Sequence, residues 1–161
     1  MKVSTILATK SPNIVTATPE QTVPEAIATL TRYNIGALVV VDDQHRPVGI
    51  VSERDIVRAA TQGEVLFSQT VGDIMTTNVV VGSPQDDLMV VAHTMTEGRF
   101  RHLPIVDPES SRLVGIISIG DVMKAQRDTY EGELYTLQTQ ILSEGRGEGS
   151  GGEGGSSNDG D

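Results

Sequence analysis

The sequence predicts a mixed α/β fold in which one β-α-β-β-α unit occurs twice. The first observation is an internal duplication, since VGIVSERDIVRA at 48–59 aligns with VGIISIGDVMKA at 114–125 and six of the twelve positions are identical. Further upstream, LVVVD at 38–42 matches LPIVD at 103–107. The second observation is the composition. The chain is 37% hydrophobic but only 3% aromatic, so its core must consist mainly of aliphatic residues, among which Val and Ile favour strands.

Each unit can be divided into the same series of elements. A short strand comes first, at 14–17 and at 79–82. A helix follows, because apolar residues recur at helical intervals within 22–35 and 86–98. Two strands separated by a polar turn come next. They are expected at 37–42 and 47–52 in the first unit, and at 102–107 and 113–118 in the second. A second helix begins just after the Ser that ends the last strand.

The duplication divides the chain into a first repeat at 1–66 and a second at 67–127. The last helix of the second repeat continues as an amphipathic extension at 128–142, with Tyr130, Leu134, Leu137 and Ile141 on one face. This face is expected to pack on the body of the chain or on a second subunit. Residues 143–161 are rich in Gly and acidic residues, so a disordered tail is expected there.

Composition also excludes several classes of function. The formal net charge of −10 argues against a nucleic-acid partner, because phosphate neutralisation requires clustered Lys and Arg. The absence of Cys excludes disulfides and thiolate chemistry. The longest apolar run, at 37–41, is too short to cross a bilayer, and the first residues do not resemble a secretory signal. A cytoplasmic protein is therefore expected.

No catalytic constellation is visible, so the chain is not expected to be an enzyme. The Ser residues are not accompanied by a His and an acid in a known motif. A Gly-rich phosphate loop with Lys followed by Ser or Thr is also missing. The three His residues (His45, His93 and His102) are scattered and do not predict a metal site.

The pattern Gly-x-x-Ser-x-x-Asp occurs once in each unit, where the last strand meets the second helix. It comprises Gly49, Ser52 and Asp55 in the first unit, and its second copy is Gly115, Ser118 and Asp121. One interpretation is a capping box, in which the Ser oxygen accepts a backbone N–H and the acid reaches back to the start of the helix. Capping boxes usually contain the longer Glu or Gln, however, and they do not require Gly in the strand.

The second interpretation is a site for an adenosine and its phosphate. The start of a helix presents free N–H groups to a phosphate, and the Ser hydroxyl adds a donor. The Asp carboxylate can accept hydrogen bonds from a ribose diol, while the Gly leaves room for the sugar or the purine. The residues alone leave capping and ligand binding as equal alternatives.

At this point the sequence resembles a known family. The tandem units are similar to a pair of cystathionine β-synthase (CBS) domains, often called a Bateman module. The resemblance covers roughly residues 1–127 and rests on the repeated Gly-x-x-Ser-x-x-Asp pattern, on RFRHLPIVD at 99–107 and on the order of elements. It implies two repeats packed by their sheets with pseudo-twofold symmetry, and two ligand clefts between them.

The resemblance also implies which residues form the clefts. Each cleft would combine the Ser and Asp of one repeat with the residues that precede the central strand of the other. Main-chain groups of the first strands would meet the adenine edge. In this numbering the first cleft comprises Ser52, Asp55, Arg101 and His102 with Arg54 nearby, the second comprises Ser118, Asp121, Gly36 and Ala37, and the adenine edge meets Thr16 and Val80.

The resulting expectation is a stand-alone regulatory module with AMP, ADP or ATP as its ligand and no required cofactor. The first cleft is expected to bind phosphorylated adenosine more tightly, because charge-assisted hydrogen bonds from Arg to phosphate are strong. A homodimer is expected, together with an unidentified regulated protein. Two alternatives remain open: a structural or protein-interaction module with vacant clefts, and a binder of S-adenosylmethionine.

Overall fold

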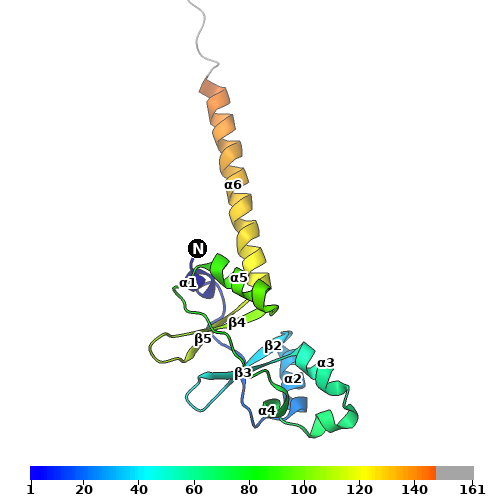
Figure 1. Cartoon of the computed structure of the whole chain (residues 1–161). Helices are drawn as coiled ribbons and strands as arrows, with labels where there is room; N and C mark the ends of the chain where they lie inside the picture. The colour runs from blue at the N-terminus through cyan, green and yellow to red at the C-terminus, as the bar shows by residue number, and fades with distance from the viewer. Residues whose placement is uncertain (148–161) are drawn as a thin grey trace, which may run out of the picture. The chain divides into compact units, whose positions relative to one another are not determined.

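The structure is a computed structural model, and it describes residues 1–147 of the chain. The chain separates into two compact units, residues 1–122 and the residues from 123 onward. Figure 1 shows the elements of the first unit, which contains both predicted repeats up to the start of the last helix.

The first repeat contains a three-stranded sheet. Its strands lie in the order β1-β2-β3, with β1 parallel to β2 and β2 antiparallel to β3. Helix α2 begins with a capping box at Thr22 and Glu25 and with Pro24 in its first turn, as expected for a helix start. The elements are β1 (Thr16–Ala17), α2 (Val23–Tyr33), β2 (Ala37–Val41), β3 (Pro47–Ser52), α3 (Glu53–Ala60) and the 3-10 helix η1 (Gly63–Ser68).

The second repeat follows the same order around a two-stranded antiparallel sheet. Its elements are α5 (Leu88–Gly98), β4 (His102–Val106), β5 (Leu113–Ser118) and the first turn of α6 (Ile119–Gly147). The helices and the long strands therefore lie close to their predicted positions. Helices α3 and α6 both begin directly after the motif Ser, at Glu53 and at Ile119.

The predicted strand at 79–82 is wrong. Only Gly82 pairs there, through a single parallel bridge to Ile105, with hydrogen bonds from the Gly82 N–H to the Pro104 oxygen and from the Val106 N–H to the Gly82 oxygen. In a parallel ladder the next donor along β4 would be the N–H of residue 104, directed at the Val80 oxygen. Because Pro104 has no N–H, the ladder stops at Gly82.

Two short helices cross over between the repeats. Helix α1 (Val3–Leu7) is bonded to the second repeat, since the Val3 N–H donates to the Asp86 oxygen at 2.9 Å and the Ser4 N–H to the Pro84 oxygen at 2.9 Å. Helix α4 (Val71–Ile74) is bonded to the first repeat through Gln21 and Pro19. Each segment therefore completes the repeat to which it does not belong in sequence.

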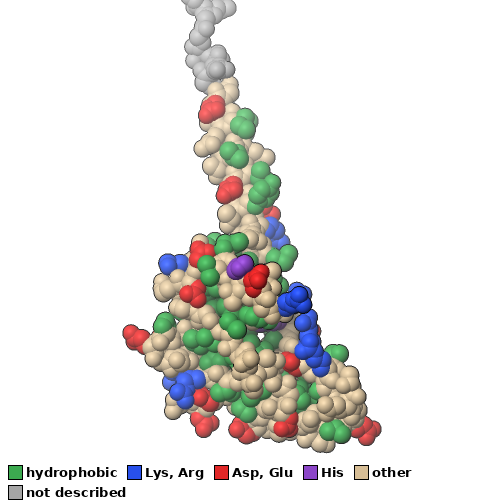
Figure 2. All heavy atoms as spheres, viewed as in Figure 1, with side chains coloured by type: hydrophobic (Ala, Val, Ile, Leu, Met, Phe, Trp, Pro, Cys, Tyr) green, Lys and Arg blue, Asp and Glu red, His purple; other side chains and the backbone are tan. Residues whose placement is uncertain are grey.

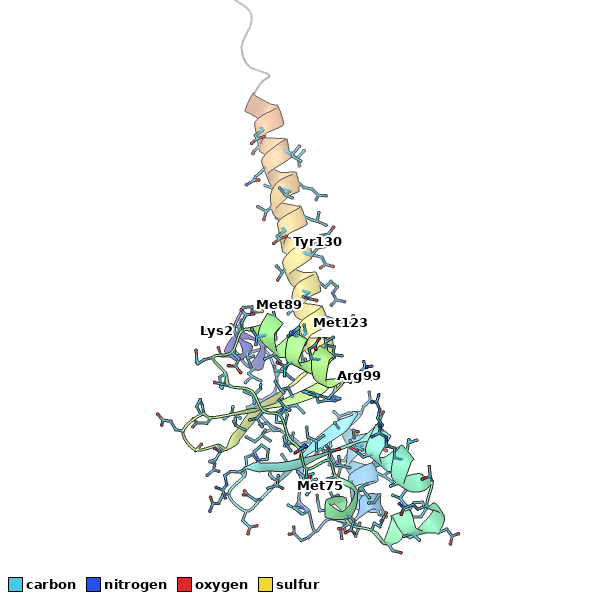
Figure 3. The ribbon with its side chains drawn as sticks, viewed as in Figure 1. Lys2, Met75, Met89, Arg99, Met123 and Tyr130 are labelled. Carbon is cyan, nitrogen blue, oxygen red and sulfur yellow. The ribbon has the colours of Figure 1, made fainter. Side chains whose placement is uncertain are left out.

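The crossed segments also explain the two motif glycines. A Cβ at Gly49 would collide with the Met75 side chain and lie 3.1 Å from the Thr76 carbonyl oxygen, and a Cβ at Gly115 would collide with Leu7. Met75 lies at the end of α4 (Figure 3). The expectation that these glycines leave room for a sugar or a purine is wrong, because the space is filled by the chain's own short helices.

The two sheets meet through a small buried cluster. Val39 and Val41 of β2 pack with Leu113 of β5, and the Leu113 N–H donates to the His45 oxygen at 2.9 Å. A larger aliphatic core fills the first repeat, where Leu38, Val40 and Val51 are almost completely buried. The structure thus confirms the predicted fold class, a mixed α/β fold of two repeats with their sheets in contact, although the first strand of the second repeat is reduced to one bridge at Gly82.

The second unit begins within α6, which is one continuous helix from Ile119 to Gly147. Residues 143–147, predicted to belong to a disordered tail, are helical. The rest of that predicted tail, 148–161, lies outside the described residues. Among the residues that the structure describes, no helix is both long enough and apolar enough to span a bilayer.

Candidate ligand-binding site

The repeated Ser and Asp form capping boxes in both repeats. In the first repeat the Ser52 N–H donates to Asp55 Oδ2 at 2.7 Å and the Asp55 N–H to Ser52 Oγ at 3.4 Å. In the second, the Ser118 N–H donates to Asp121 Oδ2 at 2.8 Å and the Asp121 N–H to Ser118 Oγ at 3.2 Å. The Asp side chain is therefore long enough to close a capping box. The argument that its short length disfavours capping is wrong.

Capping alone does not distinguish a ligand site. Asp73 reaches back to the Thr70 N–H at 2.9 Å in the same way, and Asp86 to the Ser83 N–H at 2.8 Å. Neither residue lines the main cavity of the structure, whereas Asp55 does. The position of the box, rather than its hydrogen bonds, sets Asp55 apart.

A cavity of about 1150 Å³ opens between the two repeats, and its lining residues fall between positions 36 and 120. It brings together the predicted residues of the first cleft from both repeats. The motif residues come from the end of β3 and the start of α3, and the others from the segment between α5 and β4. The predicted site residues that line it are Ser52, Arg54, Asp55, Arg101 and His102, together with Gly36, Val80 and Ser118.

Three predicted site residues lie elsewhere. Ala37 is buried in β2, where it pairs with Ser52 of β3. Thr16 lies in β1 opposite Val39, and neither Thr16 nor Asp121 lines the cavity. Gly36 and Ser118, expected in a separate second cleft, open onto the same cavity as Ser52 and Asp55.

Four arginines line this cavity, and two carboxylates, Glu53 and Asp55, oppose them. The local formal charge is therefore +2 (4 − 2), in a chain whose net charge is −10. Within residues 1–147, none of these arginines lies within 4.0 Å of a carboxylate oxygen. Figure 2 shows Lys and Arg side chains gathered on one flank of the first unit, and Figure 3 shows Arg99 at the end of α5. The four are Arg54, Arg58, Arg99 and Arg101.

Apart from Val80, the sequence did not identify the wall contributed by residues 76–80. Thr76 donates its hydroxyl to Asp55 Oδ1 at 3.1 Å, and its backbone pairs with Ile50 in both directions. Asn78 and Val79 continue this wall, and Phe100 adds an aromatic ring from the opposite repeat. The sequence feature that points to this wall is the repeated segment VGDIM at 71–75. It predicts the wall only when that segment is known to pack on the first repeat.

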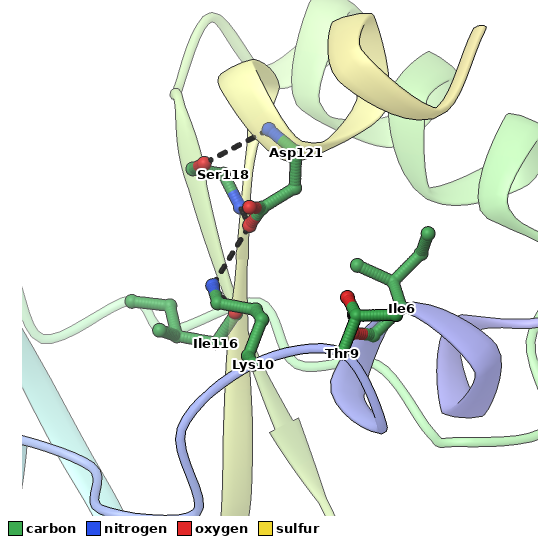
Figure 4. Close-up of polar contacts among 6 residues, drawn as sticks. All are labelled: Ile6, Thr9, Lys10, Ile116, Ser118 and Asp121. Atoms are coloured by element: carbon green, nitrogen blue, oxygen red, sulfur yellow. Dashed lines mark hydrogen bonds and ion pairs between the residues drawn. The ribbon is translucent and has the colours of Figure 1, made fainter. Parts of the chain in front are cut away.

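Asp121 has a partner that Asp55 lacks. The Lys10 ammonium lies 2.8 Å from Asp121 Oδ2 and also donates to the Ile116 carbonyl oxygen at 2.8 Å (Figure 4). Burial alone raises the pKa of Asp121, but the hydrogen bond and charge of Lys10, with the Ser118 N–H, outweigh burial and lower that pKa below its ordinary value. Asp121 is therefore an ionised carboxylate whose charge is balanced by Lys10.

The different surroundings of Asp55 and Asp121 follow from one sequence difference between the repeats. The repeated segments VSTIL at 3–7 and VGDIM at 71–75 are offset by 68 residues, so that Lys10 corresponds to Asn78. Asn78 lines the main cavity without a charge, whereas Lys10 extends onto the carboxylate of the second repeat. Within residues 1–147, no ion pair is formed by Asp55.

His102 begins β4, pairs with Ser118 of β5 and lies close to Gly36. Burial lowers the pKa of His102 most strongly, and the charges of Arg101 and Lys10 lower it further, while Asp121 and Glu53 oppose them. The imidazole is therefore neutral at pH 7, and its lone pair and its N–H are both available as hydrogen-bonding groups. The described residues contain no cluster of three or more His, Asp or Glu side chains that could hold a metal ion.

Comparisons with known proteins identify the family. A family model for the CBS domain matches residues 3–61 and again 71–128. The mitochondrial CBS domain-containing protein CBSX3 of Arabidopsis thaliana is 36% identical over 129 residues, which are 77% of this chain but 62% of that protein. The chain thus spans less than two thirds of that relative. The solved CBS-domain containing protein ATU1752 from Agrobacterium tumefaciens is 41% identical, with a TM-score of 0.73, and the match covers 78% of this chain and 99% of that one.

Two further solved structures contain adenosyl ligands. One is CBSX2 in complex with AMP, which is 26% identical with a TM-score of 0.68 over 79% of this chain and 97% of that chain. The other is the CBS domain pair of protein MJ0100 with 5′-methylthioadenosine and S-adenosyl-L-methionine, 29% identical with a TM-score of 0.71 over 80% and 98%. The duplicated motif, the paired sheets and both family matches lead to one conclusion: this chain belongs to the CBS domain family and carries two CBS domains in tandem.

Proposed function

We propose that the chain is a regulatory module that binds an adenine nucleotide (AMP, ADP or ATP) in the cavity lined by Ser52 and Asp55. The observation that carries the proposal is that Asp55, which has no cationic partner within residues 1–147, shares one cavity with four arginines. A carboxylate suits a ribose diol, and arginines suit a phosphate. The AMP complex of the related CBSX2 supports the same ligand class.

The walls of the cavity fit the remaining parts of such a ligand. A purine would meet apolar surface from five lining residues, Ile50, Val79, Val80, Phe100 and Ile119. The N-terminus of α3, where the Arg54 N–H is not needed by the capping box, favours an anion through the helix dipole. S-adenosylmethionine has no phosphate and carries a positive sulfonium, so the four arginines disfavour it.

The regulatory output depends on a second protein. A ligand at about 100 times its dissociation constant stabilises the state that binds it by about 2.7 kcal/mol, which is within the range of allosteric coupling free energies. We propose that the nucleotide shifts the relative geometry of the two repeats, and that a homodimer of the chain presents this change to its regulated partner.

The first prediction tests the site itself by isothermal titration calorimetry with AMP. Replacing Asp55 with Ala removes the carboxylate that would accept the ribose hydroxyls, and charged hydrogen bonds of this kind contribute about 1.5–3 kcal/mol. We therefore expect Asp55→Ala to weaken AMP binding by at least about tenfold. The wild-type protein should also bind AMP more tightly than adenosine and more tightly than S-adenosylmethionine.

Asp73→Ala is the matched control. Asp73 closes a capping box on Thr70 like that of Asp55 on Ser52, but it does not line the cavity. Loss of the cap costs stability without touching the ligand, so AMP affinity should stay unchanged in Asp73→Ala at temperatures where the variant is folded. Equal losses of affinity in both variants, or no binding by the wild type, would contradict the proposal in favour of a module that acts without a nucleotide.

A further inference from the structure

Within residues 1–147, the part of helix α6 that follows residue 122 carries an exposed apolar stripe. Tyr130, Leu134, Leu137 and Ile141 are 62%, 42%, 54% and 68% exposed. Their spacing of four, three and four residues is the d-a-d-a pattern of a coiled coil, in which such a stripe packs against a second helix. Exposed apolar side chains in one continuous row indicate an interaction surface.

Charged residues continue the same pattern at both ends of the stripe. Arg127 precedes Tyr130 by three residues and so takes the next a position, and Glu144 follows Ile141 by three and takes the next d position. Both belong to α6. A polar residue at an a or d position faces the partner helix directly, and it therefore influences which orientation of the two helices is stable.

We propose that α6 pairs with α6 of a second copy of this chain in the antiparallel orientation. With Leu134 opposite Leu137 of the second copy, Tyr130 lies opposite Ile141 and Arg127 opposite Glu144. These six residues of each helix (Arg127, Tyr130, Leu134, Leu137, Ile141 and Glu144) form the seam of the pair. Each end of the seam then has a pair of opposite charges. In the parallel orientation Arg127 would face Arg127 and Glu144 would face Glu144, so like charges would meet at both ends.

The flanking positions are compatible with this arrangement. Glu131 and Glu133 lie beside the seam, and in the antiparallel register they approach Gln138 and Gln140 of the second copy rather than another acid. Gly132, which lowers helix stability, occupies an outward position, where a Cβ would meet nothing within 4 Å. The seam therefore has opposite charges at its ends and no like-charge contact along its sides.

The seam is short, so the association should depend on protein concentration. It contains four apolar layers, and a self-supporting coiled coil usually extends over three or more heptads. This inference goes beyond nucleotide binding and does not rest on it, because every residue involved lies in the second unit.

Charge reversal tests the orientation by sedimentation equilibrium over a concentration series. Arg127→Glu places two acids opposite each other in two layers of the antiparallel pair, and Glu144→Arg places two bases there. Each change should weaken self-association by about tenfold, if each of the two layers loses about 0.7 kcal/mol. The double variant Arg127→Glu/Glu144→Arg restores opposite charges and should restore the association.

The matched control is Glu133→Arg, which changes charge as Glu144→Arg does on the same helix but faces Gln140 of the second copy. It should leave self-association within about twofold of the wild type. Far-UV circular dichroism verifies that every variant keeps its helix. Single reversals that do not weaken association, or a double variant that does not recover, would show that the helices do not pair in this register.

Spin labels give a measurement that leaves the seam intact. The chain has no Cys, so a single Cys at Asp128 or Thr136 can be labelled selectively. In the antiparallel pair position 136 lies opposite 135, whereas position 128 lies opposite 143, and 15 residues of helix are about 22 Å along the axis. With helices about 10 Å apart, the distance between labels should be about 10 Å longer or more at 128 than at 136.

Equal distances at positions 128 and 136 would indicate parallel pairing and would overturn the proposal. The absence of any intermolecular distance below about 50 Å at high protein concentration would overturn it too, because α6 would then be covered by its own chain or by a different partner. Dimerisation through another surface does not interfere, since it would not reproduce the predicted difference between the two labelled positions.

Discussion

Arg99 closes α5 in a left-handed backbone conformation, with a φ of 56°. The equivalent residue 65 positions earlier is Asn34, which closes α2 with a φ of 50°. Asn and Gly tolerate this region, whereas a long side chain such as Arg is uncommon there. Backbone strain of this kind often accompanies a functional site. Arg99 also lines the main cavity, so under the proposed function the strain would be retained because its guanidinium binds the phosphate.

The second prediction follows from this strain. Arg99→Asn should increase the free energy of unfolding by about 1 kcal/mol, since the backbone strain is relieved. It should weaken AMP binding by about fivefold through the loss of one charge near the phosphate. Chemical denaturation and calorimetric titration measure the two effects. Ser111→Gly is the control, because Ser111 has a φ of 60° but lies outside the cavity, so only stability should rise. A fall in stability for Arg99→Asn would contradict the interpretation.

The third prediction concerns the protonation of His102. Its pKa is lowered in the folded chain, first by burial and then by Arg101 and Lys10. Below about pH 6.5 the unfolded chain binds more protons than the folded chain, so the stability of the ligand-free protein should fall as the pH falls. A bound phosphate would add negative charge beside the imidazole and raise its pKa, so that nucleotide binding takes up a proton.

NMR titration of the His102 ring protons with and without AMP measures this change. The ratio of AMP to adenosine affinity should rise between pH 7.5 and pH 6.5, a range above the second pKa of about 6 typical of a phosphate monoester. His102→Asn should remove the rise, and His93→Asn, an exposed change on α5, should keep it. A His102 pKa that stays the same when AMP saturates the protein would place the phosphate elsewhere.

At the scale of elements, α1 and α4, which each pack on the other repeat, leave the two motif glycines with different amounts of space for a side chain. A Cβ at Gly49 would meet the flexible Met75 side chain and also a backbone atom, the Thr76 oxygen at 3.1 Å. The three atoms nearest to a Cβ at Gly115 all belong to the Leu7 side chain. A side chain can move aside, but the Thr76 backbone is held by two hydrogen bonds to Ile50.

The fourth prediction is therefore an order of stabilities. Gly49→Ala should lower the free energy of unfolding by about 2–3 kcal/mol, and Gly115→Ala by about 1 kcal/mol. Gly132→Ala should raise it by about 0.5–1 kcal/mol, because Gly132 lies in α6 with open space around it. Urea denaturation gives all three values. Equal costs at Gly49 and Gly115 would show that the 75–76 segment moves as readily as the Leu7 side chain.

Helices and strands that have a clear local sequence pattern were predictable, and elements whose pairing depends on distant residues were not. The strands at 37–41 and 47–52 are runs of β-branched residues next to turn residues, and α2 has both a capping box and a regular apolar face. The strand predicted at 79–82 had the right residues, but its pairing depends on Pro104, which is 24 residues away. Local sequence cannot show which donor the neighbouring strand lacks.

The site was predictable to a similar extent, and for a similar reason. Repeat alignment identifies which residues correspond, so it located Ser52 and Asp55. Their pairing with Arg101 and His102, which line the same cavity, came from the family resemblance. Repeat alignment does not show on which repeat a short segment packs. The wall at Thr76 and Asn78, and the reach of Lys10 to Asp121, both follow from that crossing and were therefore missed.

At the scale of the whole molecule, the duplicated fold has become asymmetric. One repeat presents to a cavity with a local charge of +2 the carboxylate of Asp55, which forms no ion pair within residues 1–147, while the other holds its Asp121 against Lys10. A ribose diol that replaced Lys10 would exchange a 2.8 Å ion pair, in which both partners are charged, for hydrogen bonds in which only the carboxylate is charged. The wild-type chain should therefore bind one nucleotide, not two.

The fifth prediction is that the number of bound nucleotides depends on Lys10. Lys10→Met keeps most of the side-chain length but removes the ammonium, so that Asp121 becomes available to a second ribose. Calorimetry at saturating AMP should give about one equivalent per chain for the wild type and a second, weaker equivalent for Lys10→Met. The double variant Lys10→Met/Asp121→Ala should return to one equivalent, because the carboxylate that the second ribose needs is gone. Two equivalents in the wild type would show that the ion pair opens at little cost, and one equivalent in Lys10→Met would show that something other than Lys10 closes the second repeat.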